Sequence, residues 1–125
     1  MMRSKAKRPA TAQRRRALFL DAARIIEDEF HEKLALDDVA RRVATSRRQL
    51  QRAFTEAGET SFRAYLQRVR MERAAELLRG SVAPVNQVAS AVGYRQPAQF
   101  AKAFRRHHGS PPSAFRVAER PALAA

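Results

Sequence analysis

The most constraining feature of this 125-residue chain is an internal repeat. Residues 38–44 (DVARRVA) align with residues 87–93 (QVASAVG), and residues 50–54 (LQRAF) align with residues 100–104 (FAKAF). The offset grows from 49 to 50 between the two blocks, so the second copy holds one extra residue there. Each copy is predicted to be a short helix, a tight turn and a second helix, which is helix-turn-helix geometry.

Apolar residues recur at helical spacing along the chain, and no segment alternates with the period of two that strands show. We therefore predict an all-α fold of about seven helices. They are expected at residues 11–32, 36–43, from 46, 61–79, from 84, 97–108 and from 112. The four glycines (58, 80, 93 and 109) follow apolar stretches, where a residue with positive φ commonly ends a helix.

These patterns predict a simple domain order. It comprises a disordered basic arm (1–10), a first helix-turn-helix subdomain (11–60), a linker helix (61–80), a second subdomain (81–116) and a flexible tail (117–125). Ser46 and Gln49 form a capping-box pattern at the start of the third helix.

The second helix of the first unit has two distinct faces. Its apolar face is predicted to pack inward, and its polar face is the one that helix-turn-helix proteins insert into the major groove. Arginine is the best side-chain donor to guanine, and glutamine pairs with adenine. An ordinary solvated face on an arginine-rich surface is the alternative. The candidate DNA contacts here are Arg47, Arg48, Gln51 and Arg52.

The corresponding face of the second unit is less basic. Ala98 offers only apolar contact, so the sequence leaves open whether this helix reads bases or mainly grips phosphates. His107 and His108 flank the helix end, where a structural or phosphate-binding role is expected rather than a metal site. The candidate DNA contacts are Arg95, Gln96, Ala98, Gln99, Lys102 and Arg105.

The charge of the chain favours a polyanionic partner. Lys and Arg total 25 against 12 Asp and Glu, which gives a net charge of +13. The charge is segregated: residues 1–16 carry seven cations and no acid, whereas residues 17–45 carry seven acids and four cations. Without Cys, disulfides, thiolate metal sites and thiol nucleophiles are excluded. No cofactor, membrane span or catalytic constellation is expected, so we predict a cytoplasmic, nucleoid-associated protein that is not an enzyme.

Residues 34–116 resemble the DNA-binding domain of the AraC/XylS transcription regulators. The matching motifs are LDDVA (36–40), Ser46 with LQR (50–52), YL (65–66), the pair Val92 and Gly93 with Tyr94, and GSPP (109–112) followed by Phe115 and Arg116. With residues 19–30 matching the first helix, the resemblance covers about four-fifths of the chain. In size the chain is similar to the stand-alone MarA/SoxS type of that family.

The resemblance implies a function and a set of contacts. Members bind two adjacent major grooves on one face of duplex DNA and recruit RNA polymerase, so activation of transcription is expected. The base-contacting positions of the family fall on Arg48, Gln51 and Arg52 in the first unit. In the second unit they fall on Pro97, Ala98, Gln99 and Lys102.

Several positions depart from the family pattern. Ala35 stands where a Ser or Thr cap is usual, at a loss of about 1 kcal/mol of helix support. Ala44 replaces the usual glycine of the first turn, and Glu59 takes the place of the glycine after the third helix. Gln96 replaces the usual Ser cap, and Pro97 replaces a polar groove residue.

We therefore predict a sequence-specific, AraC-type transcription regulator without an effector domain that binds an asymmetric site as a monomer. The sequence leaves open whether the chain is a fragment of a larger regulator. One alternative is a non-specific basic nucleoid or RNA-binding protein. Another is a TetR-like DNA-binding fragment, which residues 15–54 alone would fit but which the second copy of the repeat does not.

Overall fold

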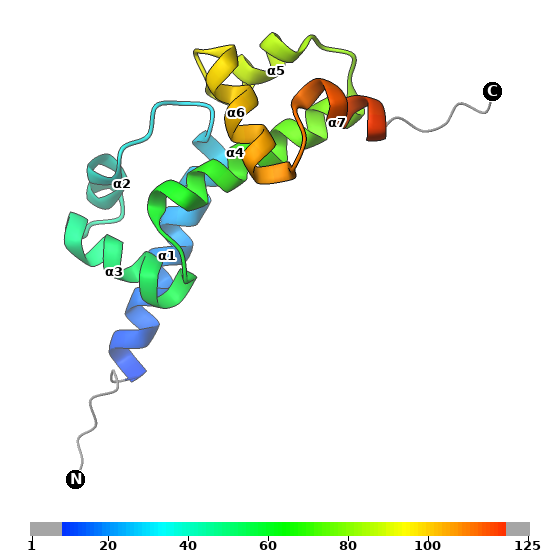
Figure 1. Ribbon diagram of the computed structural model, residues 1–125. Coiled ribbons are helices and arrows are strands. Elements are labelled where there is room, and N and C mark those ends of the chain that lie inside the picture. Colours follow the sequence, from blue (N-terminus) through cyan, green and yellow to red (C-terminus); the bar gives the residue numbers. More distant parts are fainter. Residues whose placement is uncertain (1–8, 120–125) are drawn as a thin grey trace. The chain divides into compact units, whose positions relative to one another are not determined.

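The computed structural model describes residues 9–119, and every regular element in that range is a helix (Figure 1). This confirms the predicted all-α fold and its seven helices. Their bounds are α1 (Pro9–Glu29), α2 (Leu36–Arg42), α3 (Arg47–Gly58), α4 (Phe62–Gly80), α5 (Val85–Ala91), α6 (Pro97–His108) and α7 (Pro112–Glu119).

The chain divides into two compact units, each with its own helix-turn-helix. Unit 1 combines the chain up to Glu29 with Leu34–Leu66, and unit 2 combines Phe30–Lys33 with the chain from Gln67 onward. Helix α4 is thus shared between the units, whereas the sequence predicted a separate linker segment at 61–80. The reason is that α4 buries apolar side chains along its length, so its first residues complete one core and the rest complete the other.

Unit 1 is built on close packing of α1 against α3. A Cβ atom at position 58 would collide with the Phe19 ring, so Gly58 permits this approach. The Phe19 ring centroid lies 5.1 Å from that of Phe54 and 5.7 Å from that of Tyr65, in edge-to-face geometry. The Tyr65 hydroxyl donates a 2.7 Å hydrogen bond to the Glu27 carboxylate, which satisfies its polar end.

Two arginines fix the backbone of unit 2. Arg70 donates from Nε to the carbonyl of Phe30 at 2.7 Å and from Nη2 to that of Glu32 at 2.9 Å. These bonds attach the short 30–33 segment to α4. Arg116 serves the chain after α4 in the same way, because its guanidinium donates to three carbonyls, those of Leu78, Ser81 and Ala83.

The first and last helices depart most from the sequence prediction, whereas the other helix ends agree within one residue. Helix α1 covers Pro9–Glu29 instead of 11–32: proline suits a first helical turn, and the chain leaves the helix at Phe30, which is buried. Residues 9 and 10, predicted as part of the arm, are therefore helical, and residues 1–8 lie outside the described range. Helix α7 continues to Glu119, past the predicted end of the second subdomain at 116, and the rest of the predicted tail lies outside the described residues.

The glycines were predicted correctly at two of four positions. Gly93 and Gly109 have positive φ, 96° and 87°. Gly58 and Gly80 do not, because each is still helical as the last residue of α3 or α4. After α3 it is Glu59 that adopts the left-handed conformation, with φ of 53°.

Candidate nucleic-acid interface

The turns of the two helix-turn-helix units share one backbone plan. In the first, Ala44 donates its N–H to the Arg41 carbonyl at 3.0 Å, and the next residue bonds back to Ala40. In the second, Gly93 donates to Ser90 at 3.0 Å, with the same bond following it. The first turn spans residues 43–46 and the second 92–96, which confirms the extra residue inferred from the repeat.

The second helix of each unit begins differently. The Ser46 side chain accepts a 3.0 Å hydrogen bond from the backbone N–H of Gln49, so α3 has the predicted cap. Gln96 stands at the same place before α6 and makes no capping bond. Ala35 also leaves α2 without a side-chain cap. Helices α2 and α6 therefore both begin without the side-chain cap that is usual in the family pattern.

Helix α3 presents a basic outer face. Leu50, Ala53 and Phe54 form the buried apolar face of the helix. At 100° per residue, Arg48 and Arg52 lie opposite this apolar side. Both are exposed, and within residues 9–119 neither guanidinium has a hydrogen-bond or ion-pair partner.

The other two predicted contacts of α3 lie on its flank. Gln51 is exposed there. Nη1 of Arg47 lies 3.3 Å from Oδ1 of Asp37 on α2, so Arg47 is partly neutralised. The four residues predicted as one site thus separate into an outward pair and a flanking pair.

The acidic residues of unit 1 neutralise arginines elsewhere. Arg42 donates two hydrogen bonds to the Glu29 carboxylate, at 2.7 and 2.6 Å. Arg41 pairs with Asp38 within α2. Because these pairs lie off the outer face of α3, they leave the charges of Arg48 and Arg52 on that face unneutralised.

Helix α6 carries the matching face of unit 2. Phe100, Ala103 and Phe104 are buried. All six predicted contacts of this unit are exposed, and within the described range no side-chain interaction engages their charged or amide groups. They are Arg95, Gln96, Ala98, Gln99, Lys102 and Arg105.

The outer faces of α3 and α6 correspond residue by residue at an offset of 50 positions in the sequence. Ala98 stands in the place of Arg48, and Lys102 in that of Arg52. Arg105 stands in the place of Thr55, which is exposed on the outer face of α3 and was not among the predicted contacts. Thr55 lies three residues after Arg52, a spacing that places both on one helix face, and this was the signal in the sequence that could have identified it. The basic residues of unit 2 thus lie further along their helix.

Tyr94, in the second turn, packs against Arg70 of α4. Cζ of Arg70 lies 5.8 Å from the centroid of its ring. Burial raises the pKa of Tyr94 and lowers that of Arg70, while their mutual interaction opposes both shifts. Tyr94 therefore supports the turn from which Arg95 projects.

The two histidines at the end of α6 differ in role. Nε2 of His108 lies 3.1 Å from the Met71 carbonyl, and its ring packs 4.4 Å from that of Phe104, so His108 is structural. His107 is exposed. Partial burial and the nearby His108 and Arg68 lower the pKa of His107, and Glu72 opposes the shift.

The basic stretch predicted at residues 1–16 is only partly available to a partner. Arg15 pairs with Glu56 on α3, and its side chain is 13% exposed. Arg14 and Arg16 are exposed on α1. The remaining cations of this stretch lie outside the described residues.

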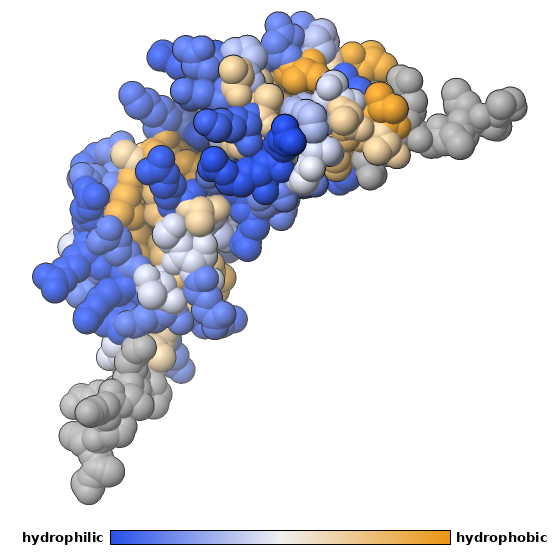
Figure 2. All heavy atoms as spheres, in the orientation of Figure 1, coloured by the Kyte–Doolittle hydropathy of each residue, from blue (hydrophilic) through white to orange (hydrophobic). Residues whose placement is uncertain are grey.

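The surface drawn in Figure 2 is dominated by hydrophilic side chains, with smaller hydrophobic areas between them. Among the helices of residues 9–119, none combines the length and the apolar character that a membrane span requires.

Comparisons with known proteins agree with this geometry. A family model for a helix-turn-helix domain matches residues 39–118. The Msm operon regulatory protein of Streptococcus mutans is 30% identical over 93 residues, which cover 74% of this chain and 34% of that protein. The chain spans about a third of the length of such regulators.

Solved structures show the same fold. The C-terminal domain of AraT, a response regulator from Geobacillus stearothermophilus, has a TM-score of 0.81 and 29% identity, covering 86% of this chain and 90% of that one. The DNA-binding domain of AdpA, a global transcriptional factor solved with a target DNA, has a TM-score of 0.76 and 30% identity, covering 80% and 90%.

The fold and its two exposed second helices define a tandem helix-turn-helix protein. The chain belongs to the AraC-type helix-turn-helix family of transcription regulators.

Proposed function

We propose that this chain binds duplex DNA sequence-specifically, with α3 and α6 in two major grooves. The observation that supports this most is the recurrence of one turn geometry before two exposed helices, each with cations that have no protein partner within residues 9–119. Such a helix is the element that helix-turn-helix proteins insert into the groove. The AdpA relative was solved with its target DNA, which adds to this support.

The residues divide into two roles. Arg48 and Arg52 are proposed to read guanine edges, and Gln51 is proposed to read an adjacent base. Arg47 is proposed to hold a phosphate, because its flanking position and its pairing with Asp37 suit a positioning contact.

Unit 2 is proposed to contribute a mixture of contacts. Ala98 supplies only apolar contact at the place of an arginine in unit 1, whereas Lys102 and Arg105 provide charge. Phosphate contacts from Arg95 and Arg105, with Gln96 and Gln99 at the helix start, are proposed to anchor this unit.

Two unlike reading faces favour a monomer on an asymmetric site. One chain already carries two recognition helices, and because Arg48 of α3 corresponds to Ala98 of α6, the two half-sites it reads are expected to differ in sequence. We propose that the two half-sites lie about one turn of the DNA helix (~10 bp) apart, and that the protein is associated with the nucleoid. Contact with RNA polymerase, which would make the chain an activator, is a further proposal that follows from the family alone.

Selection of binding sites from random duplex DNA tests the proposal. The full chain should enrich a single asymmetric sequence, and a scrambled duplex should compete at least ~10³-fold less well than the selected one. Enrichment of no sequence, with equal competition by scrambled DNA, would instead identify a non-specific basic nucleoid protein.

A further inference from the structure

A small cleft in unit 1 lies between the first half of α1 and the start of α3. Its volume is about 290 Å³, slightly below the ~300–1,000 Å³ of sites for drug-sized ligands. A small polar group therefore fits it better than an organic ligand does. We call it the α1 cleft. The residues that line it are Thr11, Arg14, Arg15, Leu18, Thr45 and Gln49.

The lining of the α1 cleft matches the groups that bind phosphate. Arginine, threonine and glutamine side chains are all regular donors to backbone phosphates in protein–DNA complexes. Neither Asp nor Glu lines the cleft. Arg15 is already paired with Glu56. Within residues 9–119, in contrast, the Arg14 guanidinium and the hydroxyls of Thr11 and Thr45 have no partner, so Arg14 supplies the charge that the cleft offers to a ligand.

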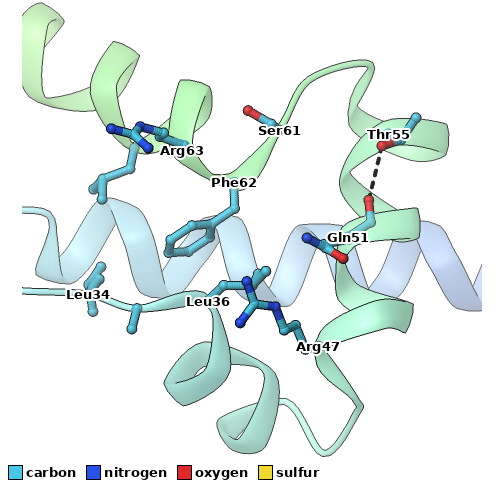
Figure 3. A pocket seen from close by; sticks show the side chains of 10 residues that line it. Leu34, Leu36, Arg47, Gln51, Thr55, Ser61, Phe62 and Arg63 are labelled. Carbon is cyan, nitrogen blue, oxygen red and sulfur yellow. Dashed lines mark hydrogen bonds between the residues drawn. The ribbon is translucent and has the colours of Figure 1, made fainter.

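The α1 cleft lies beside the outer face of α3. At about 100° per residue, Gln49 and Arg47 lie on opposite flanks of the face that Arg48 carries. The flank of Arg47 borders the start of α4, and Gln51 lies on it as well (Figure 3). The flank of Gln49 borders α1 and the α1 cleft. The outer face of α3 therefore has a cation on each side, Arg47 on one and Arg14 on the other.

Duplex DNA presents a phosphate backbone on both sides of a helix in its major groove. The groove is about 12 Å wide, and an α-helix with its side chains measures about 10–12 Å, so both flanks of such a helix face phosphates. Arg47 is already proposed to hold one of them. The α1 cleft borders the other flank, at the amino-terminal end of α3 that helix-turn-helix proteins point toward the bases.

We propose that the α1 cleft binds a backbone phosphate of the DNA strand that borders α3 on the side of α1. Arg14 supplies the charge, and Thr11 and Thr45 donate hydrogen bonds from their hydroxyls. The contact positions α3 in the groove and carries no sequence information. This inference rests on the proposed function and adds α1 to the DNA-binding elements, because the family model matches residues 39–118 and does not include that helix.

The salt dependence of DNA binding by the full chain tests this contact. Each phosphate that a cation neutralises contributes about −0.9 to the slope of log K against log salt concentration. Arg14→Gln should therefore make the slope shallower by about 0.9. It should also weaken binding roughly five- to tenfold at about 0.1 M salt, equally on the selected duplex and on its singly substituted variants. Arg14→Lys keeps the charge and should retain the wild-type slope.

Arg24→Gln is the matched control for the loss of charge. Arg24 is an exposed arginine of α1 that does not line the α1 cleft, so its replacement should leave the slope unchanged. An unchanged slope in Arg14→Gln, or the same change in the Arg14 and Arg24 variants, would overturn the phosphate contact. A loss that depends on the base sequence would also overturn it, because Arg14 would then be reading bases.

Titration of the wild type with a scrambled duplex separates this inference from the proposed function. Equal wild-type affinity for the selected and scrambled duplexes would refute sequence-specific binding. The slopes of wild type and Arg14→Gln, measured on either duplex, would still decide whether Arg14 contacts a phosphate.

Discussion

Ala44 and Gly93 occupy the same position in the two turns, and both have positive φ, 60° and 96° respectively. Only glycine adopts this conformation without steric cost. The first turn therefore carries strain that the second avoids. At position 93 the backbone is also crowded, since a Cβ atom there would lie 3.1 Å from the Phe30 carbonyl oxygen.

Replacing Ala44 with glycine is accordingly expected to stabilise the protein. Relief of the left-handed strain should raise the free energy of unfolding by about 1 kcal/mol, after allowance for the greater flexibility of glycine. Chemical denaturation measures this change. The reciprocal variant Gly93→Ala should be destabilised, and a loss of stability in Ala44→Gly would show that the turn is not strained.

Sequence patterns predicted most of this fold because its turns and caps are local. Ser46 caps α3 through the backbone of Gln49, three residues away, and such spacing is visible in a sequence. The role of Gly58 was not visible, because its reason is the approach of Phe19 from a distant helix. The division of α4 between the two cores depends on tertiary packing, so it could not be predicted from the sequence either.

The candidate site was predictable by residue type but not by partner. Helical spacing placed Arg48 and Arg52 outward, and the structure does so as well. The pairing of Arg47 with Asp37 and of Arg15 with Glu56 depends on how separate helices meet. Thr55 was overlooked because an uncharged side chain gives a weak signal.

Loss of either outward arginine should alter specificity. Arg48→Ala or Arg52→Ala is expected to cost about 1–3 kcal/mol of binding free energy on the preferred duplex and to relax preference at particular base pairs. Binding to a panel of singly substituted duplexes measures this. Arg24→Ala, on α1, should leave the preference unchanged. A uniform loss over all duplexes would place the two arginines on phosphates instead.

Arg70 should contribute to the stability of unit 2 through its backbone contacts. Arg70→Met keeps much of the packing but leaves the carbonyls of Phe30 and Glu32 without their donor, so we expect a loss of about 2 kcal/mol. Arg106→Met, at an exposed position of α6, is the control. Similar unfolding midpoints for the two variants would show that these bonds contribute little.

Stability should depend on the protonation of His107. Because partial burial, His108 and Arg68 lower its pKa below 6.5 against the opposing Glu72, folding favours the neutral imidazole. The corresponding stabilisation is fully present above about pH 6.5 and is lost as the pH falls toward the lowered value. The difference in melting temperature between wild type and His107→Gln should therefore shrink on acidification. A difference that grows at low pH would mean that the folded state favours the charged ring.

We propose that both units of the chain read one DNA molecule, with a fixed spacing between their half-sites. Inserting five base pairs between the two half-sites of the selected duplex turns one half-site to the opposite face of the DNA. We expect specific affinity, measured by equilibrium titration, to fall to that of a duplex carrying only the half-site of unit 1. Unchanged affinity for the inserted duplex would contradict the claim, because the second unit would then not be reading DNA.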